Sequence, residues 1–246
     1  MHRFFVLPED IHDKSVTITG PEAHHLKNVL RLSAGDKIIL FDGTGTSYIS
    51  VITAIKKERV TADIHSFEKE ISTYPLIILN QPLLPGKKLD FIIQKATELG
   101  VHSINLFHAR YCKPEKNMSH KLGRWQRIAL EACKQCRRNY PPGIHPPVPF
   151  TDIVEKTGDC TAKLLFWEKE SGQNLEQALP KAGMLKTDGT ISIIIGPEGG
   201  FAEQEISLAR KAGFLTVTLG RRILRAETAS ITTVAIIQYL TGNLNA

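Results

Sequence analysis

The sequence has little of what marks several large protein classes. Four cysteines in 246 residues are too few for the disulfide framework of a small secreted domain. No apolar run approaches the ~20 residues that span a bilayer, and the apolar stretch near Met1 is too short for a signal peptide. These absences predict a reduced, cytoplasmic protein that has no membrane segment.

Several motifs of nucleotide enzymes and metal sites are absent too. There is no Gly-x-x-x-x-Gly-Lys-Ser/Thr loop, and no Gly-x-Gly-x-x-Gly opens a helix. Cys133 and Cys136 have the spacing of half a zinc site, but no second pair accompanies them, and both fall on an apolar helical stripe. His24 and His25 have no partner at metal-ligand spacing. We therefore expect core cysteines and no metal.

Positive charge is concentrated in one segment. The chain carries 31 basic and 25 acidic side chains, a net charge of +6. Residues 108–146 hold nine of the basic and two of the acidic ones, interleaved with Tyr111, Trp125 and Tyr140. A one-signed patch of this kind is typical of a polyanion partner, whereas a balanced run would indicate a solvated helix face. The pattern favours RNA.

Two regions differ in their expected secondary structure. The first 72 residues predict a small β domain with one helix at 21–30 and strands at 4–7, 15–19, 37–41, 47–55 and 60–66. From Leu76 the pattern alternates, with strands at 76–79, 104–107, 164–167, 191–195 and 215–219. Helices are expected at 89–99, from a cap at Ser119 to Pro141, and at 175–182, 203–212 and 226–240. This alternation favours a mainly parallel sheet covered on both faces, and ordinary connection rules predict that it is unknotted.

Two glycine-containing turns follow late strands of this pattern. One is Gly196-Pro197-Glu198-Gly199-Gly200-Phe201, and the other runs from Leu219 to Ala229. Open α/β sheets bind ligands at the carboxyl ends of their strands. Glycine there lets the backbone approach a ligand closely or adopt a positive φ. Together the two turns predict a ligand site.

These turns resemble the cofactor loops of the SPOUT methyltransferases, and within that superfamily those of the RsmE-type 16S ribosomal RNA uridine N3-methyltransferases. Further matching segments run nearly the whole length: Arg3–Phe5, His24–Arg31, Gln94–Val101 and Glu131–Arg138. The resemblance implies an α/β SPOUT domain at 73–246 with a mainly parallel sheet and a deep trefoil knot. It also implies a PUA-like RNA-binding β-barrel at 1–72.

The resemblance implies S-adenosylmethionine-dependent methylation of uridine N3 in 16S ribosomal RNA of the assembled small subunit, by a homodimer. Two alternatives stay open. One is a SPOUT enzyme with another acceptor, such as a ribose 2′-hydroxyl. The other is a non-catalytic RNA-binding assembly factor.

The expected cofactor site follows from the chemistry of S-adenosylmethionine. Backbone groups of tight turns can read the adenine edge and the ribose hydroxyls, and apolar side chains can cover the ring. The expected cofactor residues are Phe166, Trp167, Gly196, Pro197, Gly199, Gly200, Leu219, Gly220, Ile223, Leu224, Thr228 and Ala229.

Catalysis requires that the N3 proton of uridine leave, which a nearby base or cation assists. Arg225, Glu198 and Glu227 are the candidates. For Arg225 a catalytic or substrate-orienting role is preferred to an ion pair that braces the fold. For each glutamate, base catalysis and bracing stay equally open.

RNA contacts are expected from both regions of the chain. The expected RNA-binding residues are Arg3, His24, Arg31, Arg110, Lys113, Arg124, Arg127, Lys134, Arg137 and Arg138.

Overall fold

A computed structural model describes residues 1–70, 75–112, 118–181 and 189–244. The chain divides into two compact units. The first comprises Met1–Ile71 and Leu130–Pro141, and the second Ser72–Ala129 and Pro142–Ala246. The first unit thus includes residues 130–141, which the boundary expected at residue 72 places in the second domain.

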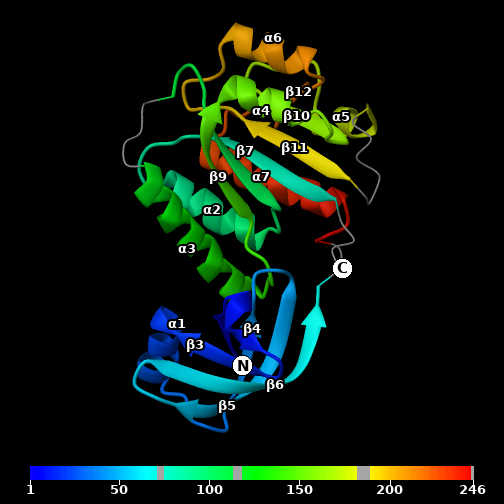
Figure 1. Cartoon of the computed structure of the whole chain (residues 1–246). Helices are drawn as coiled ribbons and strands as arrows, with labels where there is room; N and C mark the ends of the chain where they lie inside the picture. The colour runs from blue at the N-terminus through cyan, green and yellow to red at the C-terminus, as the bar shows by residue number, and fades with distance from the viewer. Residues whose placement is uncertain (71–74, 113–117, 182–188, 245–246) are drawn as a thin grey trace. The chain divides into compact units, whose positions relative to one another are not determined.

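The first unit is built on a six-stranded sheet of order β1-β4-β5-β6-β3-β2 (Figure 1). Its strands are β1 (His2–Phe5), β2 (Ile11–His12), β3 (Ser15–Thr19), β4 (Lys37–Phe41), β5 (Thr46–Ile55) and β6 (Arg59–Lys69). β1 pairs with β4 in parallel, and the other pairs are antiparallel. The strands expected at 15–19 and 37–41 are confirmed, whereas the two-residue β2 is too short to leave a periodic pattern.

One apolar core fills this β domain. The inward residues of the strands, among them Phe4, Ile18 and Leu40, share a cluster with Leu26 of the helical stretch. That stretch, expected as a single helix at 21–30, begins as α1 (Gly20–His24) and continues as a π-helical turn over His25–Val29. The turn at 42–45 connects β4 to β5 as expected, and Asp42 accepts hydrogen bonds there from the Thr44 amide and the Tyr48 hydroxyl, each at 2.8 Å.

The second unit contains a six-stranded sheet of order β12-β10-β11-β7-β8-β9, and all of its neighbouring strands are parallel. Its strands are β7 (Leu76–Pro82), β8 (Ser103–His108), β9 (Gly143–Pro149), β10 (Ala162–Phe166), β11 (Thr190–Ile195) and β12 (Leu215–Val217). The expected parallel sheet is confirmed. β9 and the following α4 (Phe150–Lys156) were not predicted. The prolines of β9 mask its strand pattern, and they are tolerated because β9 lies at the edge of the sheet.

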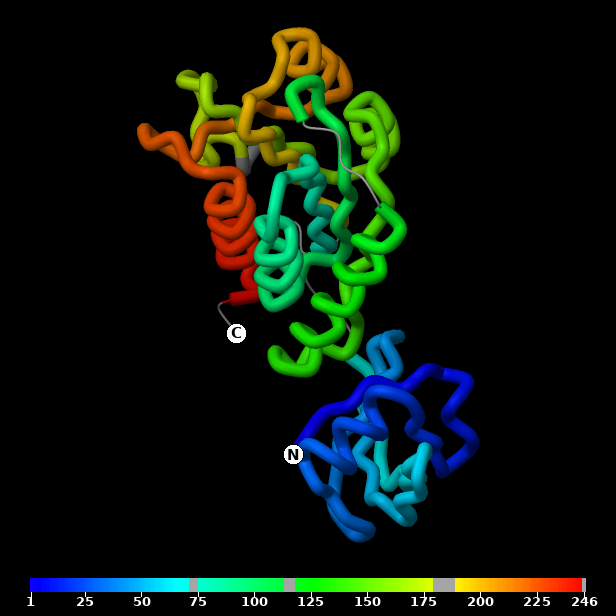
Figure 2. The backbone as a smooth tube through the Cα atoms, turned by 90° about the vertical axis from the view of Figure 1, so that its left-hand side faces the viewer, coloured from blue at the N-terminus to red at the C-terminus, as the bar shows by residue number. Residues whose placement is uncertain are grey.

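Helices cover both faces of this sheet (Figure 1). They are α2 (Lys88–Glu98), α3 (Met118–Cys136), α5 (Leu175–Lys181), α6 (Glu203–Lys211) and α7 (Ala226–Leu240). One apolar core joins the sheet to α2, α7 and the start of α3, and a second joins it to α4 and α6. α2 and α7 lie side by side (Figure 2). Ser119, expected as the cap of α3, lies inside that helix.

Alternating strand residues serve the two cores. Leu164 and Ile193 face the core that contains α2 and α7, while Leu165 and Ile194 face the core that contains α4 and α6. Since β10, β11 and β12 are adjacent and parallel, the loops that follow them emerge at one edge of the sheet.

The trefoil knot stays a prediction, because strand order and pairing do not establish how the chain is threaded. Within the described ranges, no helix combines the length and apolar character needed to cross a bilayer.

Candidate active site

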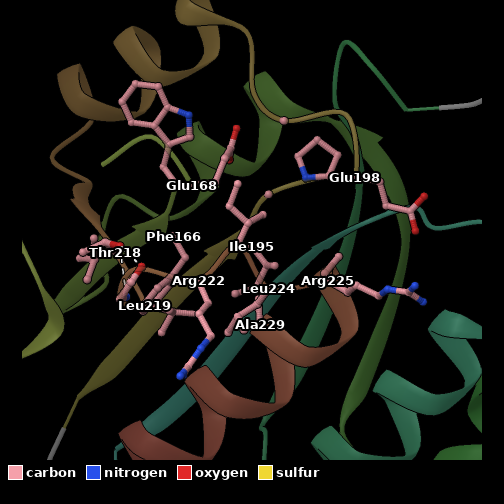
Figure 3. Close-up of a pocket in the computed structure, with 18 of the residues that line it drawn as sticks. Phe166, Glu168, Ile195, Glu198, Thr218, Leu219, Arg222, Leu224, Arg225 and Ala229 are labelled. Carbon is pink, nitrogen blue, oxygen red and sulfur yellow. Dashed lines mark hydrogen bonds between the residues drawn. The ribbon is translucent and has the colours of Figure 1, made fainter. Parts of the chain in front are cut away.

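A cavity of about 550 Å³ lies at the carboxyl ends of β10, β11 and β12 (Figure 3). Three loops line it, at residues 166–168, 195–200 and 217–226. Lys88 of α2 and Ala229 of α7 complete the wall. A volume of this size suits a small organic ligand.

The structure brings most of the predicted site residues to this cavity. The expected cofactor residues that line it are Phe166, Trp167, Gly196, Pro197, Gly199, Gly200, Leu219, Gly220, Ile223, Leu224 and Ala229. Glu198 and Arg225 line it as well. Thr228 is exposed, and neither it nor Glu227 is among the lining residues.

The first loop depends on its glycines. Gly200 has φ +74°, and its amide donates to the carbonyl of Pro197 at 2.9 Å, which closes a tight turn. Gly199 is crowded instead, because an added Cβ would lie 2.8 Å from the Cβ of Tyr111. Larger residues are therefore disfavoured at both positions, and the backbone stays open toward the cavity.

The second loop is shaped by Gly220 and ends at α7. Gly220 has φ +102°, and its amide donates to the Thr218 hydroxyl at 3.2 Å (Figure 3). Arg225 occupies the N-cap position of α7, where its carbonyl accepts from the amide of Ala229 at 2.8 Å. The start of the last helix thus fixes the backbone of Arg225 beside the cavity.

A polar cluster packs against Trp167 in the loop at residues 166–168, which forms the third wall of the cavity. The guanidinium of Arg210 lies 5.6 Å from the centre of the Trp167 ring and donates to Glu170 at 3.2 Å. Burial alone would raise the pKa of Glu170, but hydrogen bonds from Thr216 and the Gly172 amide, together with Arg210, lower it. The indole nitrogen of Trp167 is buried and has no partner among the described residues.

The charged candidates are placed differently from one another. Glu198 forms an ion pair with Lys88 at the start of α2. The side chain of Arg225 is exposed and makes no hydrogen bond or ion pair with any described residue. Figure 3 shows Glu198 and Arg225 on one side of the cavity and Leu219 on the other. Arg225 therefore does not brace either glutamate.

Lys88 was not singled out from the sequence. It sits one residue before the helix expected at 89–99, and no local pattern points from there to the cavity. Lys88 and Glu198 are 110 positions apart, so only the sheet topology brings them together.

Comparison with known proteins assigns the chain to a family. A family model described as an RNA methyltransferase domain matches residues 72–238, and one described as an RNA methyltransferase PUA domain matches residues 18–64. The chain is 31% identical to ribosomal RNA small subunit methyltransferase E of Bacillus subtilis, over 98% of this chain and 97% of that protein. It is 35% identical to the protein of that name from Synechocystis, over 97% of this chain and 78% of that protein.

The chain belongs to the small-subunit ribosomal RNA methyltransferase E family. Its fold matches the crystal structure of the Neisseria gonorrhoeae member bound to S-adenosyl methionine, with a TM-score of 0.85, 34% identity and 98% of each chain covered. It also matches a Legionella pneumophila methyltransferase in complex with the same cofactor, with a TM-score of 0.80, 29% identity and 96% of each chain covered.

The predicted RNA-binding residues of this methyltransferase-family chain fall into two groups. Some are held by other side chains. Arg124 donates to Asp90 at 2.7 Å, Lys134 pairs with Glu22 and Glu131, half-buried Arg3 donates to Asn139 at 2.7 Å, and buried Arg138 lies 4.8 Å from the Tyr140 ring. The other described members, His24, Arg31, Arg110, Arg127 and Arg137, are exposed and form no ion pair with a described residue, although Arg110 donates to Gln204 at 3.2 Å. Lys113 lies outside the described residues.

A second cavity, of about 680 Å³, lies in the β domain. We call it the barrel groove. It is lined by Thr17, Thr19, Gly20, Ala23, His24, Lys27, Asn28, Lys56, Lys57, Glu58 and Arg59. Its four cations outnumber the single carboxylate, so the groove is positively charged. Only His24 among the lining residues was singled out from the sequence, because the lysines of the β5–β6 turn lie in a region without net positive charge.

Proposed function

We propose that the protein methylates the small-subunit ribosomal RNA at N3 of a uridine, with S-adenosylmethionine as the methyl donor. The observation that carries the proposal is the cavity formed by the two glycine turns and the end of β10. It occurs in a chain that is 34% identical to a family member crystallised with S-adenosyl methionine.

The residues of the cavity suit this cofactor. Gly200 and Gly220 hold the two loops in positive-φ turns whose backbone groups are available to polar edges. Apolar side chains such as Phe166, Leu219 and Leu224 can cover an aromatic base. When bound, the cofactor supplies an electrophilic methyl group on its sulfonium.

Arg225 is the residue best placed to stabilise the substrate anion. Uridine N3 becomes nucleophilic when its proton leaves, and the negative charge then spreads onto the flanking carbonyl oxygens. A guanidinium at the cavity that is not neutralised by a described carboxylate can donate hydrogen bonds to such an oxygen. We infer that Arg225 orients the uracil and stabilises its N3-deprotonated form.

Of the two glutamates, Glu198 is the better candidate for the proton acceptor. It lines the cavity, whereas Glu227 does not and has a buried, unpartnered oxygen within the described part of the chain. The ion pair with Lys88 keeps Glu198 at the mouth of the cavity, where both side chains are partly exposed. An exposed pair of this kind is weak, about 0–1 kcal/mol, so an incoming substrate can displace it at little cost.

The protein is proposed to act as a homodimer. Apolar side chains are exposed on the neighbouring helices α2 and α7 and just beyond them: Phe91, Ile236, Tyr239, Leu240 and Leu244 are 36–58% exposed. Contiguous apolar patches mark association surfaces, and a two-fold axis would let the same patch cover itself. Light scattering at micromolar concentration checks this, and a monomer would contradict it.

RNA is proposed to contact the barrel groove as well as the exposed cations of residues 108–146. Charge reversal of Lys56 and Lys57 should weaken RNA affinity and flatten its dependence on salt, since fewer counterions are released. Charge reversal of Lys14 and Lys37, which lie in the same domain outside the groove, is the matched control. Equal effects of the two pairs would mean that only net charge matters.

Nucleoside analysis tests the activity itself. Small ribosomal subunits from a strain that lacks this enzyme are incubated with the protein and labelled S-adenosylmethionine, and the RNA is digested for mass spectrometry. The expected product is 3-methyluridine. A 2′-O-methylated nucleoside would identify another acceptor, and RNA binding without methyl transfer would indicate an assembly factor.

A further inference from the structure

Tyr111 lies against the first glycine loop and is exposed to solvent. It sits in the turn that follows β8, and 55% of its surface is exposed. Its Cβ fills the space that a side chain at position 199 would occupy, at 2.8 Å from the ideal Cβ position of Gly199. Since Gly199 lines the cavity, the tyrosine stands directly beside the cavity wall.

The backbone around Tyr111 is fixed from both sides. The amide of Cys112 donates to the carbonyl of Ala109 at 3.0 Å, which closes the turn. The amide of Arg110 donates to one carboxylate oxygen of Glu205 at 2.9 Å, and the other oxygen of Glu205 accepts from the amide of Ala202 at 2.9 Å. One side chain thus ties this turn to the segment that leaves the first cofactor loop.

Isolated exposed aromatic residues are common and need no explanation by themselves. Tyr111 differs because the fold holds its backbone in place while more than half of its surface stays exposed. The guanidinium of Arg110 lies 6.0 Å from the ring centre, at the outer limit of a cation–π contact. A fixed aromatic ring next to a cation is the arrangement with which proteins hold unpaired nucleobases.

We propose that Tyr111 is a nucleobase-stacking site at the edge of the cofactor cavity, which holds a base of the RNA substrate against its ring. This proposal rests on the proposed RNA methyltransferase function. It adds a contact for the RNA substrate that cofactor binding does not require. Glu198, which pairs with Lys88, precedes Gly199 in the chain, so polar groups that could bind a base edge line the cavity next to the residue that Tyr111 contacts.

Three substitutions separate stacking from other roles. Tyr111→Phe keeps the aromatic face, Tyr111→Leu keeps apolar bulk without it, and Tyr111→Ala removes both. Methylation of unmodified small subunits and their equilibrium binding are measured for each variant. Cofactor affinity, melting temperature and oligomeric state are measured alongside.

Loss of one base–aromatic stack weakens RNA binding by about 5- to 150-fold. Tyr111→Ala and Tyr111→Leu should therefore raise KM and Kd for the subunit in this range, while Tyr111→Phe stays within about twofold of wild type. Cofactor affinity and melting temperature should stay close to wild type, because the Tyr111 atom nearest to position 199 is Cβ, which all three variants retain.

Several outcomes would overturn the assignment. A Tyr111→Leu variant with wild-type subunit affinity would show apolar packing instead of stacking, and a joint loss of cofactor affinity and stability would show a brace. Conversion of a wild-type dimer to a monomer by Tyr111→Ala would assign the ring to a subunit interface. Wild-type protein that binds subunits without methylating them would refute the proposed activity alone, since the binding arm still tests Tyr111. Protein that does neither would refute both.

Discussion

Replacement of Arg225 by alanine separates a catalytic role from a structural one. The side chain is exposed and has no partner among the described residues, so its removal leaves no buried group unpaired. Exposed substitutions of this kind change stability by no more than about 0.5 kcal/mol. The N-cap function of position 225 uses the backbone carbonyl, which alanine retains.

The expected effect on turnover is much larger. A donor that stabilises charge in a transition state is worth roughly 10²–10³ in rate, or about 2.7–4 kcal/mol. Arg225→Ala should lose this factor in kcat while cofactor affinity stays close to wild type. Arg225→Lys should recover only part of the rate, because an ammonium group does not offer the planar set of donors of a guanidinium.

The matched control is Arg222→Ala, which removes an exposed cation from the same loop. Methyl transfer is followed under single-turnover conditions with saturating small subunits, so that weaker RNA binding does not mimic slower chemistry. An equal loss in the two variants would mean that the loop supplies only general positive charge. If Arg225→Ala lowered both the melting temperature and the cofactor affinity, the side chain would have a structural role, and the catalytic assignment would be refuted.

Other predictions concern backbone shape, pH and thiol reactivity. Gly220→Val should abolish cofactor binding measured by calorimetry at a strain cost of about 1–3 kcal/mol, whereas Gly213→Val, with φ +88° and outside the cavity, should show similar strain and retain binding. Because the pKa of Glu170 is lowered in the folded state, its stabilising effect is present at neutral pH and is lost as the pH falls through the acidic range. Glu170→Gln should therefore be less stable by about 1–3 kcal/mol at neutral pH, and the difference in melting temperature should vanish in acid; a constant difference would contradict the linkage. Burial raises the pKa of the Cys133 thiol to about 12, so it should resist thiol reagents at neutral pH until the protein unfolds, and rapid labelling of native Cys133 would contradict this.

Local periodicity predicted the sheet and helices of the second unit well where elements were long and apolar. α7 begins and ends at the expected residues, because its apolar pattern starts after a turn and stops at polar residues. The sequence pattern did not predict β9, because its prolines carry no strand signal. Its position at the edge of the sheet depends on tertiary structure, which local sequence does not reveal. The π-helical turn at the end of the first helical stretch could not be predicted from the sequence either. Over so few residues, the apolar periodicity of a π-helix cannot be distinguished from that of an α-helix.

The site was predictable to the extent that it depends on backbone conformation. Glycines at strand ends carry a local signal, and the structure places both predicted turns on one cavity. Side-chain partners carry no such signal. The pairing of Glu198 with Lys88, and the tying of Arg124 and Lys134 by carboxylates, follow from packing between segments distant in sequence. The high positive charge of residues 108–146 therefore overstates the number of cations left free for RNA.

The composition of the cavity also explains why cofactor binding and chemistry should be separable. Its lining includes glycine backbone and apolar side chains such as Phe166 and Leu224, which we propose to contact the neutral adenine ring and its polar edges. Arg225 lies on the side of Glu198 in Figure 3, opposite Leu219. A uracil that enters from that side would contact the Arg225 guanidinium before it reaches the proposed cofactor residues. Under the proposed roles, changes to the glycines should thus act on cofactor affinity, and changes to Arg225 on the rate of methyl transfer.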